Sequence, residues 1–369
     1  MKDKSGSDPK IKIGVLYGGR SGEHDVSLCS AASVVAALNQ SKYEVIAIGI
    51  DRDGRWYVQD RPEIIPDRDF GRILSLKKRG RWLVNHFEQE NKLHIYNVEN
   101  RNEEVIVDIV FPVLHGTYGE DGTLQGLLEM AGLPYVGAGV FASAIAMDKA
   151  HFKRLCEMRG LPVVEWAEQH SASLDAATAL RHFPLPVFVK PANLGSSVGV
   201  AKAKTLDELD AALRDAARYD SKVIVERSIA GQELECAVLG NDAPQAATPC
   251  EIIPSREFYD YEDKYLLDKA ETALPARITT EQAAEVKRLA VECFRASDCA
   301  GLARVDFLLE SSTGKLYINE INTLPGFTSI SMFPKMWAYE GLAFPALVEK
   351  LIELARERHA ARAALRYER

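Results

Sequence analysis

ARVDFLLESSTGKLYINEIN (303–322) decides the fold of the C-terminal part of this 369-residue chain. Two apolar runs flank the polar break SSTG, which is typical of antiparallel strands joined in a tight hairpin. Side chains alternate across a strand, so Arg304 and Asp306 share one face of the first strand. By the same rule, Glu320 and Asn322 share one face of the second. We therefore expect two carboxylates, an amide and a guanidinium to converge where the strands would otherwise offer apolar core residues.

The polar side chains of this hairpin have the chemistry of a magnesium site. Oxygen ligands without histidine or cysteine suit Mg²⁺, which takes one or two carboxylates and completes its shell with water and nucleotide phosphates. The alternative is a surface hairpin closed by a salt bridge. The next residues, TLPGFTSIS (323–331), place a glycine beside several hydroxyls. Their backbone amides could hold an oxyanion or a carboxylate, or they could form a simple strand-ending loop.

Length and composition restrict the class of protein. A chain of 369 residues exceeds what one hydrophobic core usually serves, so we expect two or three domains. A net charge of −8 disfavours binding to nucleic acid. The six cysteines form no CxxC pair and are expected to be buried and reduced. The polar first residues lack the apolar run of a signal peptide or a membrane span, so we expect a cytoplasmic protein without a membrane partner.

The N-terminal region, residues 8–140, predicts a doubly wound α/β domain with a parallel sheet. Its expected elements are strands at 10–17, 45–50 and 105–113 and helices at 26–38 and 124–131. Residues 51–104 are charged and irregular, and they predict only an insertion with short strands.

Two loops of this domain follow the carboxyl ends of strands, where a parallel sheet delivers ligands. GGRSGEHD (18–25) contains Glu23, a candidate partner for a substrate ammonium, although an ordinary turn before a helix would also explain its acidic residues. HGTYGEDG (115–122) contains His115, which we keep as a site candidate. The two loops are expected to lie side by side above the sheet.

The rest of the chain predicts two smaller units, 141–228 and 229–369. In the first, an apolar strand ends at Lys190 and continues into ANLGSSVG, a pliable loop that could fold over nucleotide phosphates but is not a Walker A motif. In the second, Thr279 and Gln282 form the capping box of an amphipathic helix. Further helices are expected around 147–159, at 206–218 and from 345 onward.

Seven segments, taken together and in this order, resemble the D-alanine–D-alanine ligases of the ATP-grasp superfamily. They are GGRSGEHDVS (18–27), HGTYGEDGTLQG (115–126), MDK (147–149), KPANLGSSVGV (190–200), YDYEDKY (259–265), GLARVDF (301–307) and NEINTLPGFTSIS (319–331). The resemblance extends over roughly residues 10 to 355. It implies a mixed α/β fold, in which an N-terminal doubly wound parallel-sheet domain is followed by a two-subdomain ATP-grasp fold.

The resemblance also implies a reaction, the ATP-dependent joining of two D-alanine molecules for peptidoglycan synthesis. ATP would phosphorylate the carboxylate of the first D-alanine, and the amine of the second would attack the acyl phosphate through a tetrahedral intermediate. Two Mg²⁺ ions, or Mn²⁺ in their place, would be held by Asp306, Glu320 and Asn322. The implied ATP-binding residues are Lys149, Lys190, Ser196, Ser197, Glu226, Glu233 and Lys264. A homodimer is a further expectation from the family.

For the first substrate, the resemblance implies that Glu23 anchors the ammonium and that His115 lies nearby. Ser196 and Tyr265 would hydrogen-bond in a row with Glu23 and clamp a lid shut. A closed lid is needed because water would hydrolyse an acyl phosphate before the amine reached it. Tyr265→Phe is therefore expected to loosen the clamp and to weaken ligation.

For the second half-reaction, the implied oxyanion stabilisers are Arg304 and the backbone amide of Gly326. Ser331 would meet the carboxylate of the second substrate. The general base stays unassigned, because the resemblance does not identify the group that takes the proton of the attacking amine.

Three other functions remain open on the sequence. Ligases that make D-alanyl-D-lactate or D-alanyl-D-serine are similar but change the lid around the tyrosine, whereas YDYEDKY keeps the form of the dipeptide ligases. Another ATP-grasp carboxylate–amine ligase would share the metal ligands, but not the surroundings of Glu23 and Ser331. A catalytically silent nucleotide-binding protein is disfavoured by the retention of Arg304, both carboxylates and both lysines.

Overall fold

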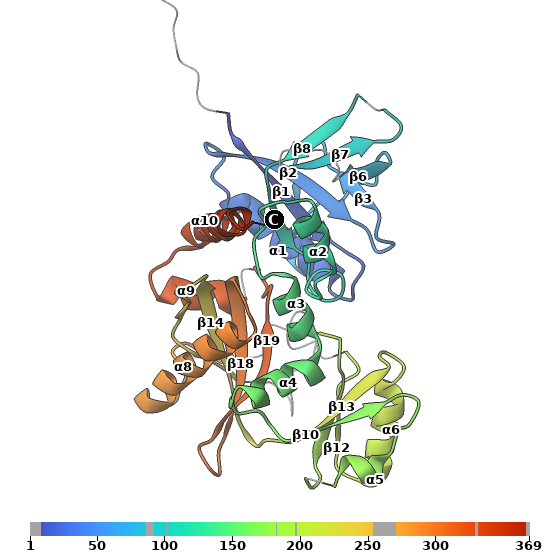
Figure 1. Ribbon diagram of the computed structural model, residues 1–369, viewed down its shortest axis with the longest axis vertical. Coiled ribbons are helices and arrows are strands. Elements are labelled where there is room, and N and C mark those ends of the chain that lie inside the picture. The colour runs from blue at the N-terminus through green and yellow to red at the C-terminus, as the bar shows by residue number, and fades with distance from the viewer. Residues whose placement is uncertain are drawn as a thin grey trace, which may run out of the picture.

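The structure is a computed structural model that describes residues 9–85, 92–100, 102–181, 183–195, 198–253, 271–328 and 331–366. Figure 1 shows three bodies, each built on a β-sheet, with helices α3 (Val140–Met147) and α4 (Lys149–Met158) running between them. In the part of the chain that these ranges cover, no helix is both long enough and apolar enough to cross a membrane. All six cysteines are buried and free.

The first sheet has the order β3-β2-β1-β9, and its β1, β2 and β9 are parallel while β3 pairs antiparallel at the edge. The strands are β1 (Ile11–Gly18), β2 (Tyr43–Ile50), β3 (Trp56–Val58) and β9 (Ile109–Val113). The predicted parallel sheet of this region is thereby confirmed. It forms because these strands are apolar on both sides, which suits a sheet that is covered on both faces.

The two faces of β1 pack against different helices, which confirms the doubly wound arrangement. Ile13, Val15 and Tyr17 belong to the core under α1 (His24–Ala37). Leu16 faces the other way, into a core that α2 (Thr123–Met130) closes with Leu128.

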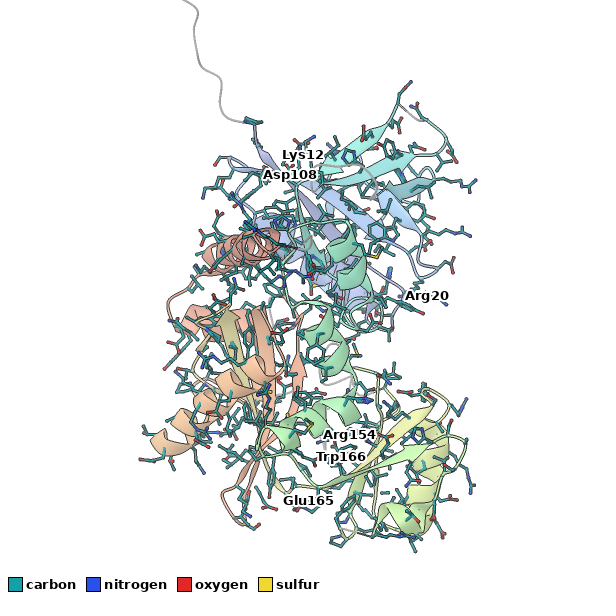
Figure 2. The ribbon with its side chains drawn as sticks, viewed as in Figure 1. Lys12, Arg20, Asp108, Arg154, Glu165 and Trp166 are labelled. Carbon is teal, nitrogen blue, oxygen red and sulfur yellow. The ribbon has the colours of Figure 1, made fainter. Side chains whose placement is uncertain are left out.

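One prediction for this region was wrong, because residues 105–113 are not a single strand. The chain changes sheets at Asp108, whose carboxylate accepts a 2.8 Å hydrogen bond from the Lys12 amide (both labelled in Figure 2). This polar residue interrupts the apolar run because its carboxylate binds the backbone of β1. Before it, β8 (Glu104–Val107) belongs to the small sheet β6-β7-β8, and after it, β9 belongs to the first sheet. The predicted insertion of short strands is confirmed as β4 (Ile64–Asp67), β5 (Gly71–Leu74), β6 (Trp82–Asn85) and β7 (Leu93–Asn97).

The second sheet has the order β10-β13-β11-β12 and is antiparallel. Its strands are β10 (Trp166–His170), β11 (Val187–Pro191), β12 (Ala201–Ala203) and β13 (Lys222–Arg227), and its helices are α5 (Ala176–Ala179) and α6 (Leu206–Ala216). Apolar side chains such as Val189 and Val225 pack on α5 and α6. Lys190 and Glu226 lie on the opposite face of the sheet, which α5 and α6 do not cover.

The third sheet has the order β17-β16-β14-β18-β19, with β15 paired to β14. Its strands are β14 (Gly231–Gly240), β15 (Gln245–Ala246), β16 (Cys250–Ile253), β17 (Glu271–Ala273), β18 (Gly301–Glu310) and β19 (Leu316–Asn322). Helix α8 (Thr280–Ala296) covers one face, and the predicted capping box of Thr279 and Gln282 is present. The other face packs on α9 (Met332–Tyr339) and α10 (Phe344–Ala363).

Helix α10 connects the third sheet to the first. Its Leu347 and Leu351 lie in one continuous core with Ile13 and Val15 of β1 and Leu239 of β14. Burial of apolar surface stabilises such a core by about 25 cal/mol per Å². The loops at the ends of β1, β9 and β19 are therefore held close to one another.

Candidate active site

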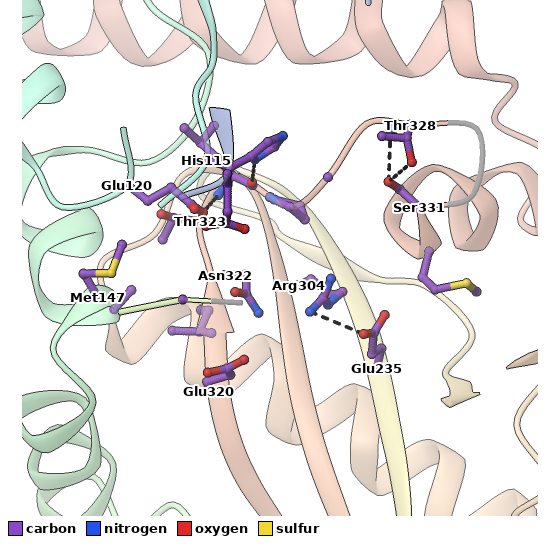
Figure 3. A pocket seen from close by; sticks show the side chains of 18 of the residues that line it. His115, Glu120, Met147, Glu235, Arg304, Glu320, Asn322, Thr323, Thr328 and Ser331 are labelled. Atoms are coloured by element: carbon purple, nitrogen blue, oxygen red, sulfur yellow. Dashed lines mark hydrogen bonds and ion pairs between the residues drawn. The ribbon is translucent and has the colours of Figure 1, made fainter. Parts of the chain in front are cut away.

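A cavity of about 120 Å³ lies where the three bodies meet. Figure 3 shows its walls, with His115 and Glu120 from the first body and Arg304, Glu320 and Asn322 from the third. Eight of the residues predicted from the sequence line it, namely Glu23, His115, Lys149, Arg304, Glu320, Asn322, Gly326 and Ser331.

The predicted hairpin is confirmed as β18 and β19, which pair antiparallel. Arg304 lies opposite Asn322, and Asp306 lies opposite Glu320, so all four side chains start from one face of the sheet. A bulge follows Asp306 in the register. The bulge interrupts the regular pairing next to the polar side chains, and the pairing continues from Phe307 and Ile318.

The sequence reasoning missed Glu235, which extends this group onto a third strand. Glu235 of β14 lies opposite Asp306 of β18, so Glu235, Asp306 and Glu320 form a row across three neighbouring strands. The signal was present in the polar alternation of GQELECAV, where Glu233 and Glu235 interrupt a buried strand. The alternation alone does not show what Glu235 contacts; the pairing of β14 with β18 places it opposite Asp306.

Arg304 lies within this acidic row and neutralises part of it. Its Nε and one terminal nitrogen donate to the two oxygens of Asp306 at 2.7 and 2.6 Å, and Glu235 lies 3.3 Å away. Burial works against the charge of the guanidinium, but Asp306 and Glu235 outweigh burial and raise the pKa of Arg304. Arg304 is thus a fixed, fully charged donor in a place with little water.

The donor set next to Arg304 fits magnesium. Asp306 and Glu320 provide carboxylates and Asn322 provides an amide that also donates to Asp306 at 3.0 Å. Over the described ranges no cluster of three or more His, Cys, Asp and Glu residues suits a metal, so the fit depends on two carboxylates and an amide. That is the composition that Mg²⁺ accepts when water and phosphate complete its shell. Because Arg304 occupies both oxygens of Asp306, a bound ion would have to share this carboxylate with it.

The loop that follows β1 and the loop that follows β9 lie side by side, as predicted. Ser21 joins them, because its hydroxyl accepts from the Glu23 amide at 3.1 Å and donates to the His115 carbonyl at 2.7 Å. A Cβ on Gly116 would lie 2.6 Å from a carboxylate oxygen of Glu23, and one on Gly195 would lie 3.2 Å from it. The Glu23 carboxylate therefore reaches into the cavity between two glycines, where larger residues would displace it.

The hydrogen bonds of His115 fix its tautomer. Nδ1 lies 3.1 Å from the Leu324 carbonyl, which can only accept, so Nδ1 carries a proton. The Ser30 hydroxyl accepts from the Phe327 amide at 3.3 Å and lies 3.0 Å from Nε2, to which it donates. Burial lowers the pKa of His115 although the charge of Glu23 opposes this shift. His115 is thus a neutral side chain that holds the backbone of residues 324–327.

Glu120 is a second residue that the sequence reasoning did not select. Its two oxygens accept hydrogen bonds from the amides of Gly116 at 2.7 Å and Leu324 at 3.0 Å. Burial, followed by the charge of Glu23, raises the pKa of Glu120 to about 8. Glu120 was visible in HGTYGEDG, but its partner Leu324 is far away in the sequence.

The segment after β19 brings Gly326 and Ser331 together. The Ser331 hydroxyl accepts from the Thr328 amide at 3.0 Å and lies 2.8 Å from the Thr328 hydroxyl. A Cβ on Gly326 would lie 2.8 Å from Ser331 Oγ. Gly326 and the Ser331 hydroxyl therefore lie next to each other in the lining of the cavity that also contains Arg304.

Of the predicted ATP-binding lysines, Lys149 lines the cavity and Lys190 lies on β11 of the second sheet. Lys149 donates to the Leu194 carbonyl at 2.7 Å and lies 3.7 Å from Glu320. Lys190 lies 2.7 Å from Glu226, whose other oxygen lies 3.0 Å from Lys153. The sequence reasoning missed Lys153, although it follows Lys149 at the spacing of one helical turn.

The remaining predicted residues differ in how far the structure describes them. Glu233 is half-buried on β14, two residues before Glu235 and on the same face. Ser196, Ser197, Lys264 and Tyr265, together with the rest of YDYEDKY, lie outside the described residues.

Comparison with known proteins shows to which family this chain belongs. Residues 12–138 match the model of the D-ala D-ala ligase N-terminus, and residues 155–353 match that of the D-ala D-ala ligase C-terminus. The D-alanine–D-alanine ligase of Solibacter usitatus is 51% identical over 98% of this chain and 100% of its own length. The chain belongs to the D-alanine–D-alanine ligase family.

A further relative and two solved structures are also similar to this chain over nearly its full length. The D-alanine–D-alanine ligase of Acetivibrio thermocellus is 45% identical over 95% of this chain and 97% of that protein. The D-alanine–D-alanine ligase structure from Coxiella burnetii superimposes with a TM-score of 0.78 at 36% identity, over 96% of both chains. VanG D-Ala:D-Ser ligase from Enterococcus faecalis superimposes with the same TM-score at 35% identity, over 94% of this chain and 100% of that one.

Proposed function

We propose that this enzyme is an ATP-dependent ligase that joins two D-alanine molecules into D-alanyl-D-alanine for peptidoglycan synthesis. The names of its relatives and both family models support this reaction. The observation that carries the proposal is the position of Arg304, Asp306, Glu320 and Asn322 on one face of a hairpin. Arg304, Glu320 and Asn322 line the same cavity as Glu23. This arrangement offers a site for an amino acid on one wall and a site for phosphate on the other.

In the first half-reaction, a carboxylate oxygen of the first D-alanine attacks the γ-phosphorus of ATP, and the bond to ADP breaks. Glu23 would hold the ammonium of this D-alanine, with neutral His115 beside it. Lys149 and Lys190 would bind the phosphates, because both side chains are positively charged and largely withdrawn from solvent. Glu226 and Glu233 would take the adenine and ribose side.

In the second half-reaction, the amine of the second D-alanine attacks the acyl phosphate. Arg304 and the Gly326 amide would stabilise the oxyanion of the tetrahedral intermediate, since both line the cavity and Arg304 stays charged there. Ser331 would hydrogen-bond to the carboxylate of the second substrate. The amide forms and phosphate leaves.

Asp306, Glu320 and Asn322 would hold two Mg²⁺ ions, for which Mn²⁺ is an expected substitute. When bound, these ions screen the negative charge of the transferring phosphoryl group. Ser196, Ser197 and Lys264 would contact ATP, and Ser196 and Tyr265 would form a row of hydrogen bonds with Glu23 that clamps a lid shut. Closure of the lid would exclude the water that would hydrolyse the acyl phosphate.

We further propose a division into three domains, 8–140, 141–228 and 229–369, and a homodimeric assembly. A cytoplasmic location is proposed because ATP is the co-substrate and because all six cysteines are free thiols.

Phosphate release tests the reaction directly. Protein, Mg-ATP and D-alanine should release inorganic phosphate and form D-alanyl-D-alanine in equal amounts, and L-alanine should give neither product. Absence of phosphate release at saturating D-alanine would sink the proposal.

The same assay decides the choice of the second substrate, which matters because VanG, a D-Ala:D-Ser ligase, superimposes equally well. D-alanine should be the preferred acceptor over D-serine and D-lactate. A higher kcat/KM for D-serine or D-lactate would assign the enzyme to the alternative ligases.

A further inference from the structure

Lys153 is a completely buried lysine, with 0% of its surface exposed. It lies on α4, four residues after Lys149, and so points to the same side of the helix. Its ammonium forms an ion pair with Glu226 at 3.0 Å, and within the described residues it makes no hydrogen bond. Lysine is almost never fully buried unless it is paired, so the pair with Glu226 is what keeps this side chain in place.

Glu226 lies between two lysines. One carboxylate oxygen lies 3.0 Å from Lys153 and the other lies 2.7 Å from Lys190. Glu226 is on β13 and Lys190 on the neighbouring β11, two residues out of register on the same face of the sheet. Burial alone would favour the neutral acid, but Lys153 and Lys190 outweigh burial and lower the pKa of Glu226 to about 2. The group therefore contains two positive charges and one negative charge.

The third charge changes what Lys190 can do. If Lys190 were the only partner of Glu226, turning it toward a phosphate would leave a buried carboxylate without a counter-charge, which is strongly unfavourable. With Lys153 in place, Glu226 keeps a partner when Lys190 turns away. We propose that Lys153 is a positioning residue that neutralises Glu226 and so makes Lys190 available to the phosphates of ATP. This inference rests on the proposed ATP site and deepens it.

Lys153→Met tests the inference, because methionine keeps much of the length of the lysine side chain and removes its charge. In the variant, Glu226 should hold Lys190 and weaken its contact with phosphate. We expect the non-hydrolysable analogue AMP-PNP with Mg²⁺ to bind about tenfold more weakly in calorimetry, while adenosine, which has no phosphate, keeps its affinity within about twofold. Equal losses for the two ligands would indicate a merely structural role, and unchanged affinity for both would show that Lys153 is not needed. Either result overturns the inference.

The matched control is Arg154→Met, which removes a positive charge from the neighbouring position of the same helix. Arg154 is exposed, pairs with Glu168 at 2.8 Å and stacks on Trp166 (both Arg154 and Trp166 are labelled in Figure 2). It should leave the binding of AMP-PNP and of adenosine unchanged.

A second variant covers the case in which Lys153→Met does not fold. In Lys153→Met/Glu226→Gln both buried charges are removed together, so Lys190 has no carboxylate to hold it. The preference for AMP-PNP over adenosine should then be at least that of the wild type, and a lower preference contradicts the inference. If the wild type binds neither ligand, the proposed ATP site itself is wrong, which is a different result from any of those above.

Discussion

Glu120 accepts a 3.0 Å hydrogen bond from the backbone amide of Leu324, a residue 204 positions further along the chain. The Leu324 carbonyl is held by His115 at 3.1 Å, so both backbone polar groups of Leu324 are bound by the loop after β9. The Phe327 amide is held in the same way by Ser30 of α1. The first body therefore determines where Gly326, between these anchored residues, presents its amide.

Removal of the Glu120 acceptor should impair both stability and catalysis. In Glu120→Ala the amides of Gly116 and Leu324 lose their acceptor in a buried site, which costs about 1–3 kcal/mol for each group left unsatisfied. Misplacement of the oxyanion donor should lower kcat by about tenfold or more. Urea unfolding and steady-state ligation measure the two effects.

Glu120→Gln is the finer variant, because it keeps the shape but turns an NH₂ group toward one of two N–H donors. Its stability and its kcat should lie between those of the wild type and those of Glu120→Ala. Asp53→Asn, a change of an exposed acid in the loop after β2, should alter stability by less than about 0.5 kcal/mol. Wild-type stability and turnover in Glu120→Ala would show that the bond to Leu324 has no such role.

Glu120 should also impose a pH dependence on stability. Its pKa is raised from 4.5 to about 8 in the folded protein, by burial and then by the charge of Glu23. Between these two values the folded state retains a proton that the unfolded state has lost, so this group makes the free energy of unfolding fall as pH rises from about 4.5 to 8. Glu120→Gln should flatten that slope. Parallel stability-against-pH curves for the two proteins would contradict the assignment.

The tautomer of His115 makes a prediction that depends on Ser30. The wild-type ring should show Nδ1 protonated and Nε2 unprotonated in ¹⁵N NMR of labelled histidine, with the signal assigned by its loss in His115→Gln. Ser30→Ala removes the donor to Nε2 and the acceptor of the Phe327 amide, and should lower the free energy of unfolding by about 1–3 kcal/mol. A wild-type ring protonated on Nε2 would be incompatible with the hydrogen bonds described.

The hairpin could be predicted from the sequence because its information is local. Alternation within each strand places Arg304 with Asp306 and Glu320 with Asn322, and a short turn brings the two strands together. The same is true of the capping box at Thr279, whose partner is three residues away.

The residues that were missed depend on contacts between distant segments. Glu235 joins the acidic row only because β14 pairs with β18 in one register. Lys153 and Glu120 find their partners Glu226 and Leu324 on other elements, and no periodic pattern marks such a pair in advance. The break at Asp108 belongs to the same class, since the carboxylate that ends β8 acts on Lys12.

The proposed metal site makes the sharpest prediction for Asp306. Asp306→Asn keeps the size of the side chain, but removes its charge and one of the two oxygens that bind Arg304. We expect kcat to fall about 10²–10³-fold, because the oxyanion donor loses its orientation, and half-saturation to need at least about tenfold more Mg²⁺. Titrating phosphate release against Mg²⁺ separates the two effects, because high Mg²⁺ should recover only the part of the loss that is due to the ion.

Glu310→Gln is the matched control, since Glu310 is on the same strand but pairs with Arg227 at 2.8 Å, away from the cavity. If Asp306→Asn kept the Mg²⁺ dependence of the wild type, Asp306 would not be a magnesium ligand, and its carboxylate would serve Arg304 alone.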